Sequence, residues 1–234
     1  MREIICSEPF ILALVLCSYY VGLRIERATR LSFANPLLIA LIIIIPTLCL
    51  LDIDYPTFER GSHFINFLLG PSVVALGFTL HRQIDLIKGN VMAILCAIFA
   101  GSVVGIVSVI IICRLLGAPQ EVITSLQPKS VTTPIALGIS ANTGGIVSLT
   151  AITVVICGIL GSVAGPAMLK VLRIRNKIAK GLALGAAAHG IGTSRAMQMG
   201  PVEGAFGGMA IGLMGVITAI LVPIIMKIIE SLGL

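Results

Sequence analysis

Long apolar runs, each close to the length of a membrane-spanning helix, alternate along this chain with short polar connections. A helix needs about 20 predominantly apolar residues to cross a hydrocarbon layer of about 30 Å. Hydropathy does not assign two stretches, Gln120 to Asn142 and Ile178 to Met199. The remaining pattern predicts six transmembrane helices, over Pro9 to Leu23, Asn35 to Leu51, Phe64 to Leu80, Val91 to Leu115, Gly145 to Leu172 and Glu203 to Ile229.

The first apolar run has the length of a secretory signal peptide. Glu3 and Glu8 weaken the positive start that such a peptide needs, and the small-x-small cleavage pattern is missing. Arg24, Arg27 and Arg30 follow the run directly. We therefore expect a first membrane helix.

The composition supports a membrane protein. Hydrophobic residues make up 57% of the 234 residues and charged residues 11%, with a mean hydropathy of +1.10, whereas soluble domains carry about 25% charged residues. We expect an all-α integral membrane protein of the inner (cytoplasmic) cell membrane, with a single membrane-embedded domain over residues 1–234. The net charge of +6 lies in short loops. It does not form a basic stripe with aromatic residues, which argues against nucleic acid as a partner.

Basic loop residues predict the orientation, because Lys and Arg are enriched on the cytoplasmic side. If the N-terminus is outside, the fourth predicted crossing ends outside at Leu115. A full crossing by Gln120 to Asn142 would then place the strongest basic cluster on the outer face. We therefore expect that segment to be a re-entrant hairpin from outside. The cluster comprises Lys170, Arg173, Arg175, Lys177 and Lys180.

The stretch Ile178 to Met199 begins in this basic cluster and breaks around His189 to Thr193. Its length and break suit a second re-entrant hairpin, from inside, although one full crossing also fits. The two hairpins would have opposite topology, and Ser130 to Ala136 can be aligned with Gly190 to Ala196. This arrangement predicts an inverted repeat, which is common among secondary transporters.

Polar segments with proline or glycine interrupt both predicted hairpins, over residues 128–134 and 189–195. Such breaks at membrane depth are costly and persist where the backbone is buried in protein or lines a cavity. Thr133-Pro134 has the features of a helix start, and Thr193 with Ser194 offers a second cap. Glycines in the second break allow close backbone approach. Two helix N-termini facing one cavity favour an anion.

Full positive charges flank the two breaks, at Lys129 and Arg195. Arginine can bind a carboxylate through two parallel hydrogen bonds. The sequence therefore predicts a binding site for a small carboxylate substrate, formed by Lys129, Ser130, Thr132, Thr133, His189, Gly190, Gly192, Thr193, Ser194, Arg195 and Glu203.

Each charged candidate also has a structural alternative. Lys129 can extend to the membrane interface or pair with Glu121, and Arg195 can pair with Glu203. His189 can hydrogen-bond a neighbouring helix or carry a coupling proton. Glu203 can act as a favourable charge at a helix N-terminus. The sequence does not decide whether a coupling ion would be H⁺ or Na⁺.

Zinc-protease, phosphate-loop and Gly-x-Ser-x-Gly motifs do not occur in the sequence. We therefore expect no enzyme and no cofactor or metal. The six cysteines stand alone in or beside apolar segments and are expected to be packing residues. Glycines four apart, as in Gly161 with Gly165 and Gly181 with Gly185, predict close helix packing and are compatible with a homodimer.

Three motifs carry a resemblance to a known family. Leu69-Gly70-Pro71, the segment from Pro128 to Ala136 and the segment from Ala188 to Phe206 are similar to those of the LrgB/CidB family of membrane proteins. The resemblance extends over the chain from about Asn35 onward. It implies a transport core over residues 61–234, with broken helices near 128–134 and 189–195, and N-terminal helices over 1–60 that form a scaffold or dimer contact.

The family resemblance also implies two functions. Bacterial members are associated with small holin-like LrgA/CidA partners, with murein hydrolase control and lysis, and with pyruvate handling; a plastid relative exchanges glycolate and glycerate. We therefore expect a secondary transporter of a small monocarboxylate of the glycolate, glycerate or pyruvate class, working by alternating access, for example as an elevator. The alternative is a non-transporting partner or regulator of a holin-like pore. Any LrgA-like contribution is expected from another chain.

Overall fold

The computed structural model describes residues 5–29, 35–82 and 84–231, and within these ranges every regular element is a helix. The all-helical fold expected from the sequence is confirmed. The chain divides into two compact units, Met1–Gly77 (unit 1) and Phe78–Leu234 (unit 2). The boundary between the units lies within the helix His63–His81. The sequence instead predicted one domain, with N-terminal helices over residues 1–60 and a core over 61–234.

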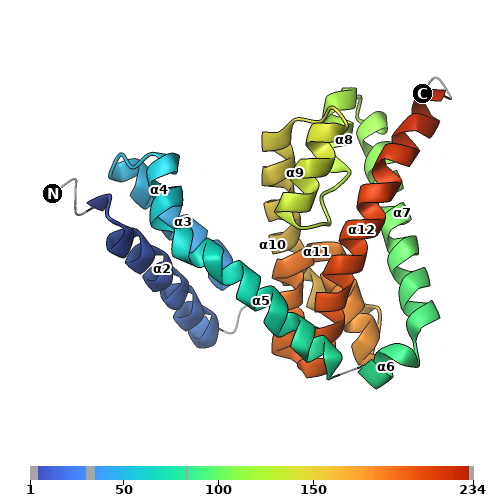
Figure 1. Ribbon diagram of the computed structural model, residues 1–234, viewed down its shortest axis with the longest axis horizontal. Coiled ribbons are helices and arrows are strands. Elements are labelled where there is room, and N and C mark those ends of the chain that lie inside the picture. The colour runs from blue at the N-terminus through green and yellow to red at the C-terminus, as the bar shows by residue number, and fades with distance from the viewer. Residues whose placement is uncertain (1–4, 30–34, 83, 232–234) are drawn as a thin grey trace. The chain divides into compact units, whose positions relative to one another are not determined.

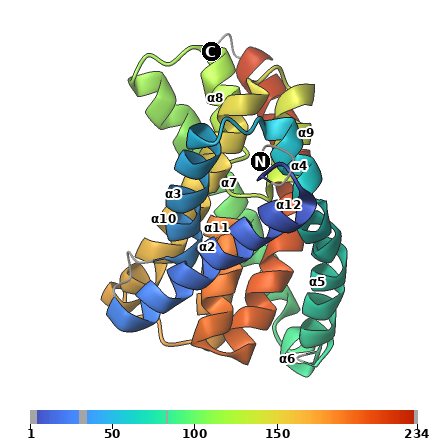
Figure 2. The same cartoon turned by 90° about the vertical axis from the view of Figure 1, so that its left-hand side faces the viewer.

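Unit 1 is built around a close pair of helices, α2 and α3, which Figure 2 shows. The side chain of Asn35 caps the second of them by accepting a hydrogen bond from the Leu37 backbone N–H at 2.9 Å. A Cβ at Gly22 would lie 2.6 Å from the Pro36 carbonyl oxygen, so only glycine permits this approach. The helices of the unit are α2 (Glu8–Thr29), α3 (Pro36–Leu50), α4 (Tyr55–Gly61) and most of α5 (His63–His81).

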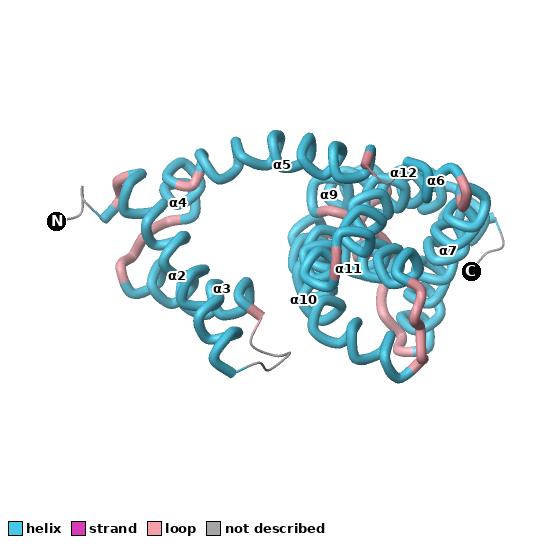
Figure 3. Tube along the Cα trace, turned by 90° about the horizontal axis from the view of Figure 1, so that it is seen from below, coloured by secondary structure: helices cyan, strands magenta, loops and turns pink. Residues whose placement is uncertain are grey.

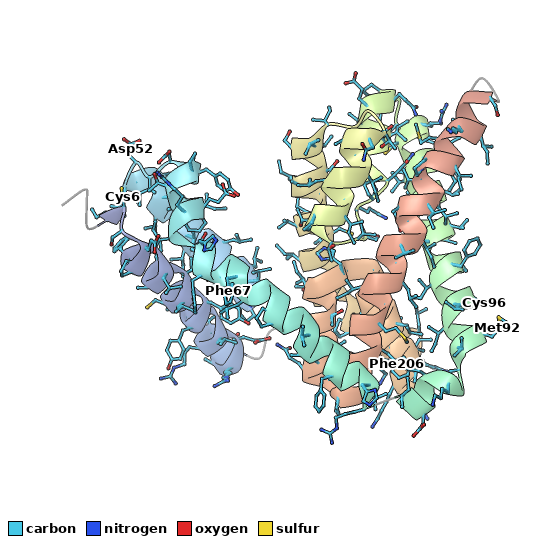
Figure 4. All side chains as sticks on the ribbon, in the orientation of Figure 1. Cys6, Asp52, Phe67, Met92, Cys96 and Phe206 are labelled. Carbon is cyan, nitrogen blue, oxygen red and sulfur yellow. The ribbon has the colours of Figure 1, made fainter. Side chains whose placement is uncertain are left out.

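Unit 2 is a bundle around a shared apolar core. Figure 3 shows its helices α7, α10, α11 and α12 end-on. Phe206 of α12 is fully buried, whereas Met92 and Cys96 of α7 are exposed, as Figure 4 shows. The helices of the unit are α6 (Ile84–Lys88), α7 (Val91–Leu115), α8 (Gln120–Leu126), α9 (Thr133–Asn142), α10 (Val147–Val171), α11 (Lys177–Met199) and α12 (Pro201–Ser231).

Four helices in the described ranges are long and apolar enough to cross a membrane: α2, α7, α10 and α12. They coincide with four of the six predicted crossings. The predicted crossing from Asn35 is the apolar α3, which at 15 residues is shorter than the usual length of about 20. The crossing from Phe64 lies in α5. Large apolar side chains such as Val104 and Leu160 are exposed on α7 and α10, as expected for a multi-pass membrane protein.

Two helical hairpins lie against α10 and α12. Hairpin 1 (Gln120–Asn142) comprises α8, α9 and the loop between them, and hairpin 2 is α11, which reverses direction at Ala188 and His189. Because of this reversal, Gly192 lies against the Leu184 carbonyl oxygen. In Figure 1 the yellow hairpin 1 lies along the upper half of α12 and the orange hairpin 2 along its lower half.

The helix cap predicted in the first break differs from the structure by one residue, and the one predicted in the second break by several residues. Helix α9 begins at Thr133, so Thr132 occupies the cap position, and its side chain makes no capping hydrogen bond. In hairpin 2 the non-helical dihedral angles fall at His189 and the residue before it. Thr193 and Ser194 therefore lie inside the second half-helix. Packing against α10 decides where the chain reverses. The positions of hydroxyl residues in the sequence do not indicate this packing.

Candidate functional site

The two hairpins are attached to α10 one helical turn apart. The hydroxyl oxygen of Thr150 lies 2.9 Å from the Ser125 carbonyl oxygen and 2.8 Å from the Ser140 hydroxyl, so it contacts both arms of hairpin 1. Four residues further along α10, the Val154 carbonyl oxygen accepts a hydrogen bond at 3.0 Å from Nε2 of His189, at the reversal of hairpin 2. Helix α10 therefore holds both hairpins through contacts on successive turns.

His189 stabilises the reversal of hairpin 2. Its backbone has φ 41°, in a region that residues with a side chain rarely adopt, and its ring is buried. A Cβ at Gly158 would lie 2.7 Å from Nε2 of His189, and one at Gly161 would lie 2.5 Å from Cβ of Ala188. These α10 glycines leave the space that the reversal fills. Of the two roles expected for His189, the structure shows the hydrogen bond to a neighbouring helix.

A cavity of about 910 Å³ extends along α7, α10 and the first half of hairpin 2. Helix α7 lines it from Asn90 to Gly105, which corresponds to about 22 Å of helix at 1.5 Å per residue. The cavity is mainly apolar, with many alanine and glycine residues in its lining. Lys129 and Ser130 of hairpin 1 line it beside Gly105, and Asn176 lines it near the start of hairpin 2.

Lys129 is the one charged side chain among the described residues that line this cavity. Its ammonium Nζ lies 3.5 Å from the Ser130 hydroxyl and 4.0 Å from the place that a Cβ on Gly105 would take. The side chain is half-buried. In the part of the chain that the structure describes, it forms no ion pair with Glu121, one of the alternatives from the sequence. Among the described lining residues, the cavity thus contains a cation and no carboxylate.

Cys157 of α10 lies at this end of the cavity, and no sequence motif marks it as a site residue. Its sulfur lies 3.7 Å from the Ala187 carbonyl oxygen in hairpin 2. The same side chain lines the cavity together with Lys129 and Ser130 of hairpin 1. A lone cysteine in an apolar run has no local signature of a site, so only the tertiary structure identifies it.

Of the predicted site residues, only Lys129 and Ser130 line this cavity in the described structure. Thr132 and Thr133 are half-buried at the start of α9, and Gly190 and Ser194 are exposed in hairpin 2. No Cβ contact restricts Gly190, whereas Gly192 closely contacts the backbone of hairpin 2, so the expected close approach is found only at Gly192.

The last three candidates are in the second half of hairpin 2 and in the first turn of α12. Thr193 is buried, and its hydroxyl oxygen has no hydrogen-bond partner in the described structure. Nη1 of Arg195 donates a hydrogen bond to Oε1 of Gln198 at 2.6 Å. Glu203 is buried in the first turn of α12, with its carboxylate beside Gly200. Three or more His, Cys, Asp or Glu side chains do not gather as metal ligands anywhere in the described ranges.

Comparison with known proteins places the chain in a family. The sequence profile of the LrgB-like family matches residues 15–228. The "Uncharacterized protein YxaC" of Bacillus subtilis (strain 168) is 33% identical over 220 residues, which cover 94% of this chain and 96% of the relative. The "Antiholin-like protein LrgB" of Bacillus mycoides (strain KBAB4) is 33% identical over 215 residues, or 92% and 94% of the two chains. No solved structure matches significantly. With its helical membrane architecture and this match over nearly its whole length, the chain belongs to the LrgB-like family.

Proposed function

We propose that this protein is a secondary transporter of a small monocarboxylate that works by alternating access. The observation that carries the proposal is the cavity that ends beside Lys129 and Ser130, where both hairpins meet Cys157. Ionisable residues inside membrane proteins are rare and usually mark a substrate or ion pathway. Broken helices near the centre of a bundle form the substrate sites of many transporters.

The chemistry of this end of the cavity favours a small anion with one negative charge. The Lys129 ammonium supplies one positive charge, and Ser130 supplies a hydroxyl beside it. A charge in apolar surroundings without a partner is costly, so a carboxylate in contact with Lys129 would be stabilised by their attraction and by the removal of this cost. The alanine and glycine residues of the lining leave room for a short aliphatic body such as that of glycolate, glycerate or pyruvate.

The position of the cavity supports access from one side. Its lining includes Asn90, before α7, and Asn176, before α11, and the basic cluster lies in the same connection as Asn176. Because basic residues are enriched in cytoplasmic loops, this end would face the cytoplasm. We infer that the structure is the state open to the cytoplasm, and that movement of the hairpins, for instance as an elevator, opens the site to the other side.

Uptake into liposomes tests this function. Purified protein is expected to take up labelled glycolate, glycerate or pyruvate, and preloading the vesicles with the same acid should accelerate uptake by exchange. Lys129→Ala should reduce uptake to the level of empty liposomes, whereas Lys129→Arg, which keeps the charge, should retain part of it. Lys227→Ala, an exposed change on α12 outside the cavity, is the matched control. Full uptake by Lys129→Ala would refute the site.

Arg195 needs its own variant, because it does not line the cavity in this structure. The sequence predicts that Arg195→Ala abolishes uptake. If the residue belongs to the site only after the hairpins move, this variant should lose exchange while still binding the acid, as seen by thermal stabilisation. Normal exchange by Arg195→Ala would restrict the site to the Lys129 group.

A second candidate function rests on the names of the relatives. Several are called antiholin-like, which favours a regulator that acts together with a small LrgA/CidA-like membrane protein. A regulator of this kind has no need to bind a carboxylate. Thermal stabilisation of the purified protein by glycolate, and its loss in Lys129→Ala, would therefore favour the transporter, whereas no response to any of the three acids would favour the regulator.

A further inference from the structure

A second hollow, of about 500 Å³, lies at the end of unit 2 where α10 ends and hairpin 2 begins and ends. Four basic side chains from α10, the following loop and hairpin 2 line it. Its apolar lining includes the buried Leu169 and, at the other end of hairpin 2, Met199. The hollow is separate from the Lys129 cavity, and they share no lining residue in the described structure. The four basic residues are Lys170, Arg173, Arg175 and Lys180.

The backbone turns at the end of α10, where three consecutive residues line this hollow, Arg173, Ile174 and Arg175. The Ile174 N–H donates to the Leu169 carbonyl oxygen at 2.9 Å, and the Arg173 N–H donates to the Lys170 carbonyl oxygen at 3.1 Å. This turn holds Arg173 at φ 56°, the left-handed conformation that glycine usually occupies after a helix. An arginine stands there instead, with its side chain at the hollow.

Among the described residues, no carboxylate lines the hollow beside these four charges. No carboxylate in the described ranges forms an ion pair with any of the four basic side chains. Like charges this close repel one another, and an anion held between them relieves the repulsion. Guanidinium groups match phosphate oxygens particularly well, because they donate parallel hydrogen bonds.

The apolar side chains and the location narrow the class of anion. Leu169, Ile174 and Met199 give the hollow an apolar surface next to its charges. Because basic residues are enriched in cytoplasmic loops, this end of the bundle would face the cytoplasm, next to the lipid headgroups of that side. Basic pockets between membrane helices on this side bind the headgroups of anionic lipids.

We propose that this hollow binds the phosphate headgroup of an anionic phospholipid. The headgroup contacts Arg173 and Arg175 at the end of α10 and Lys180 at the start of hairpin 2, and the first part of an acyl chain lies against Leu169 and Met199. A bound lipid then joins α10 to both ends of hairpin 2 and restrains the hairpin. The proposal of a lipid-binding site does not depend on the proposed transport function. Its effect on transport rests on the proposed function.

Lipid retention measured by native mass spectrometry tests the site. The protein is purified in detergent and given phosphatidylglycerol, phosphatidylcholine or inorganic phosphate. The variant Arg173→Gly with Arg175→Ala removes two charges, and glycine suits the backbone at position 173, so we expect it to fold. Retention of phosphatidylglycerol should fall roughly thirtyfold, because each basic residue near an anionic headgroup contributes a factor of about five. Lys177→Ala, an exposed change in the same cluster outside the hollow, should retain the lipid.

Three results would overturn the proposal. Equal losses in Lys177→Ala would show diffuse attraction of lipid to a basic surface. Equal retention of phosphatidylcholine would show that the headgroup charge is not recognised. Displacement of phosphatidylglycerol by inorganic phosphate at similar concentration would show a phosphate site without a lipid. Uptake in liposomes with and without phosphatidylglycerol is a separate measurement. If lipid retention behaves as expected but no acid is taken up, the lipid site holds and the proposed transport fails.

Discussion

A methyl group added at Gly185 tests how closely hairpin 2 must pack on α12. Its Cβ would lie 2.8 Å from Cα of Gly207 and would collide with the carbonyl oxygen of that residue, whereas ordinary contact begins near 3.4 Å. Both atoms belong to the backbone, so the two helices would have to separate by about 1 Å. Overpacking of this kind typically costs about 1–3 kcal/mol.

The matched control is Gly212→Ala on α12, where a Cβ meets no atom within 4 Å. Both variants gain about 1 kcal/mol of helix propensity when glycine becomes alanine. This gain cancels in the comparison, and the difference in unfolding free energy is the overpacking cost alone. For about 2 kcal/mol, Gly185→Ala should melt about 4–8 °C below Gly212→Ala, from the usual 2–4 °C per kcal/mol for chains of this size.

The assay is thermal unfolding of detergent-solubilised protein fused to a fluorescent protein, followed by size-exclusion chromatography after heating. Gly181→Ala is a second case, because its Cβ would meet the Glu203 carbonyl oxygen. We expect both variants to fall below the control. Equal melting temperatures for Gly185→Ala and Gly212→Ala would refute the argument that backbone contact between hairpin 2 and α12 limits the residue at position 185.

Two further predictions concern how the hairpins are held to α10. His189→Gly and His189→Ala both lose the hydrogen bond to Val154, but glycine adopts φ 41° without strain. The glycine variant should therefore melt at a higher temperature than the alanine variant, by the equivalent of about 1–3 kcal/mol. A higher melting temperature for the alanine variant would contradict the argument that the backbone at position 189 is strained. Thr150→Val removes the hydroxyl that contacts hairpin 1 at 2.9 and 2.8 Å and should cost about 1–3 kcal/mol and speed amide hydrogen exchange in that hairpin. Thr153→Val removes a hydroxyl that bonds only to its own helix, and it should leave exchange in hairpin 1 unchanged.

The sequence predicts most of the helices because their determinants are local. Apolar runs of the right length locate α7, α10 and α12 within two residues at each end, and they locate the start of α2, which continues six residues beyond its predicted end at Leu23. The polar residues between them locate both breaks. The caps could not be placed from the same residues, because a hydroxyl beside a break suits several nearby positions, and contacts to another helix decide among them. For His189 the deciding contacts are those with Val154 and Gly158.

The candidate site was predicted only in part, for a related reason. Lys129 and Ser130 were found because charge and polarity are exceptional in an apolar chain. Cys157 was missed because its residue type is ordinary in a membrane helix, and it lies in the cavity only through the packing of α10 against both hairpins. Arg195 was grouped with Lys129 on charge alone, but it hydrogen-bonds Gln198 and does not line the same cavity.

The sequence by itself determined the membrane character, the helical class, the family resemblance and the two breaks, because hydropathy and charge act through each residue's own transfer energy between water and lipid. Only the tertiary structure decided where each break turns, which residues surround Lys129 and that basic residues scattered over α10, its loop and hairpin 2 share one hollow. The turn at His189, for example, depends on the space that Gly158 and Gly161 of α10 leave for it, and such a close approach is a property of two helices together.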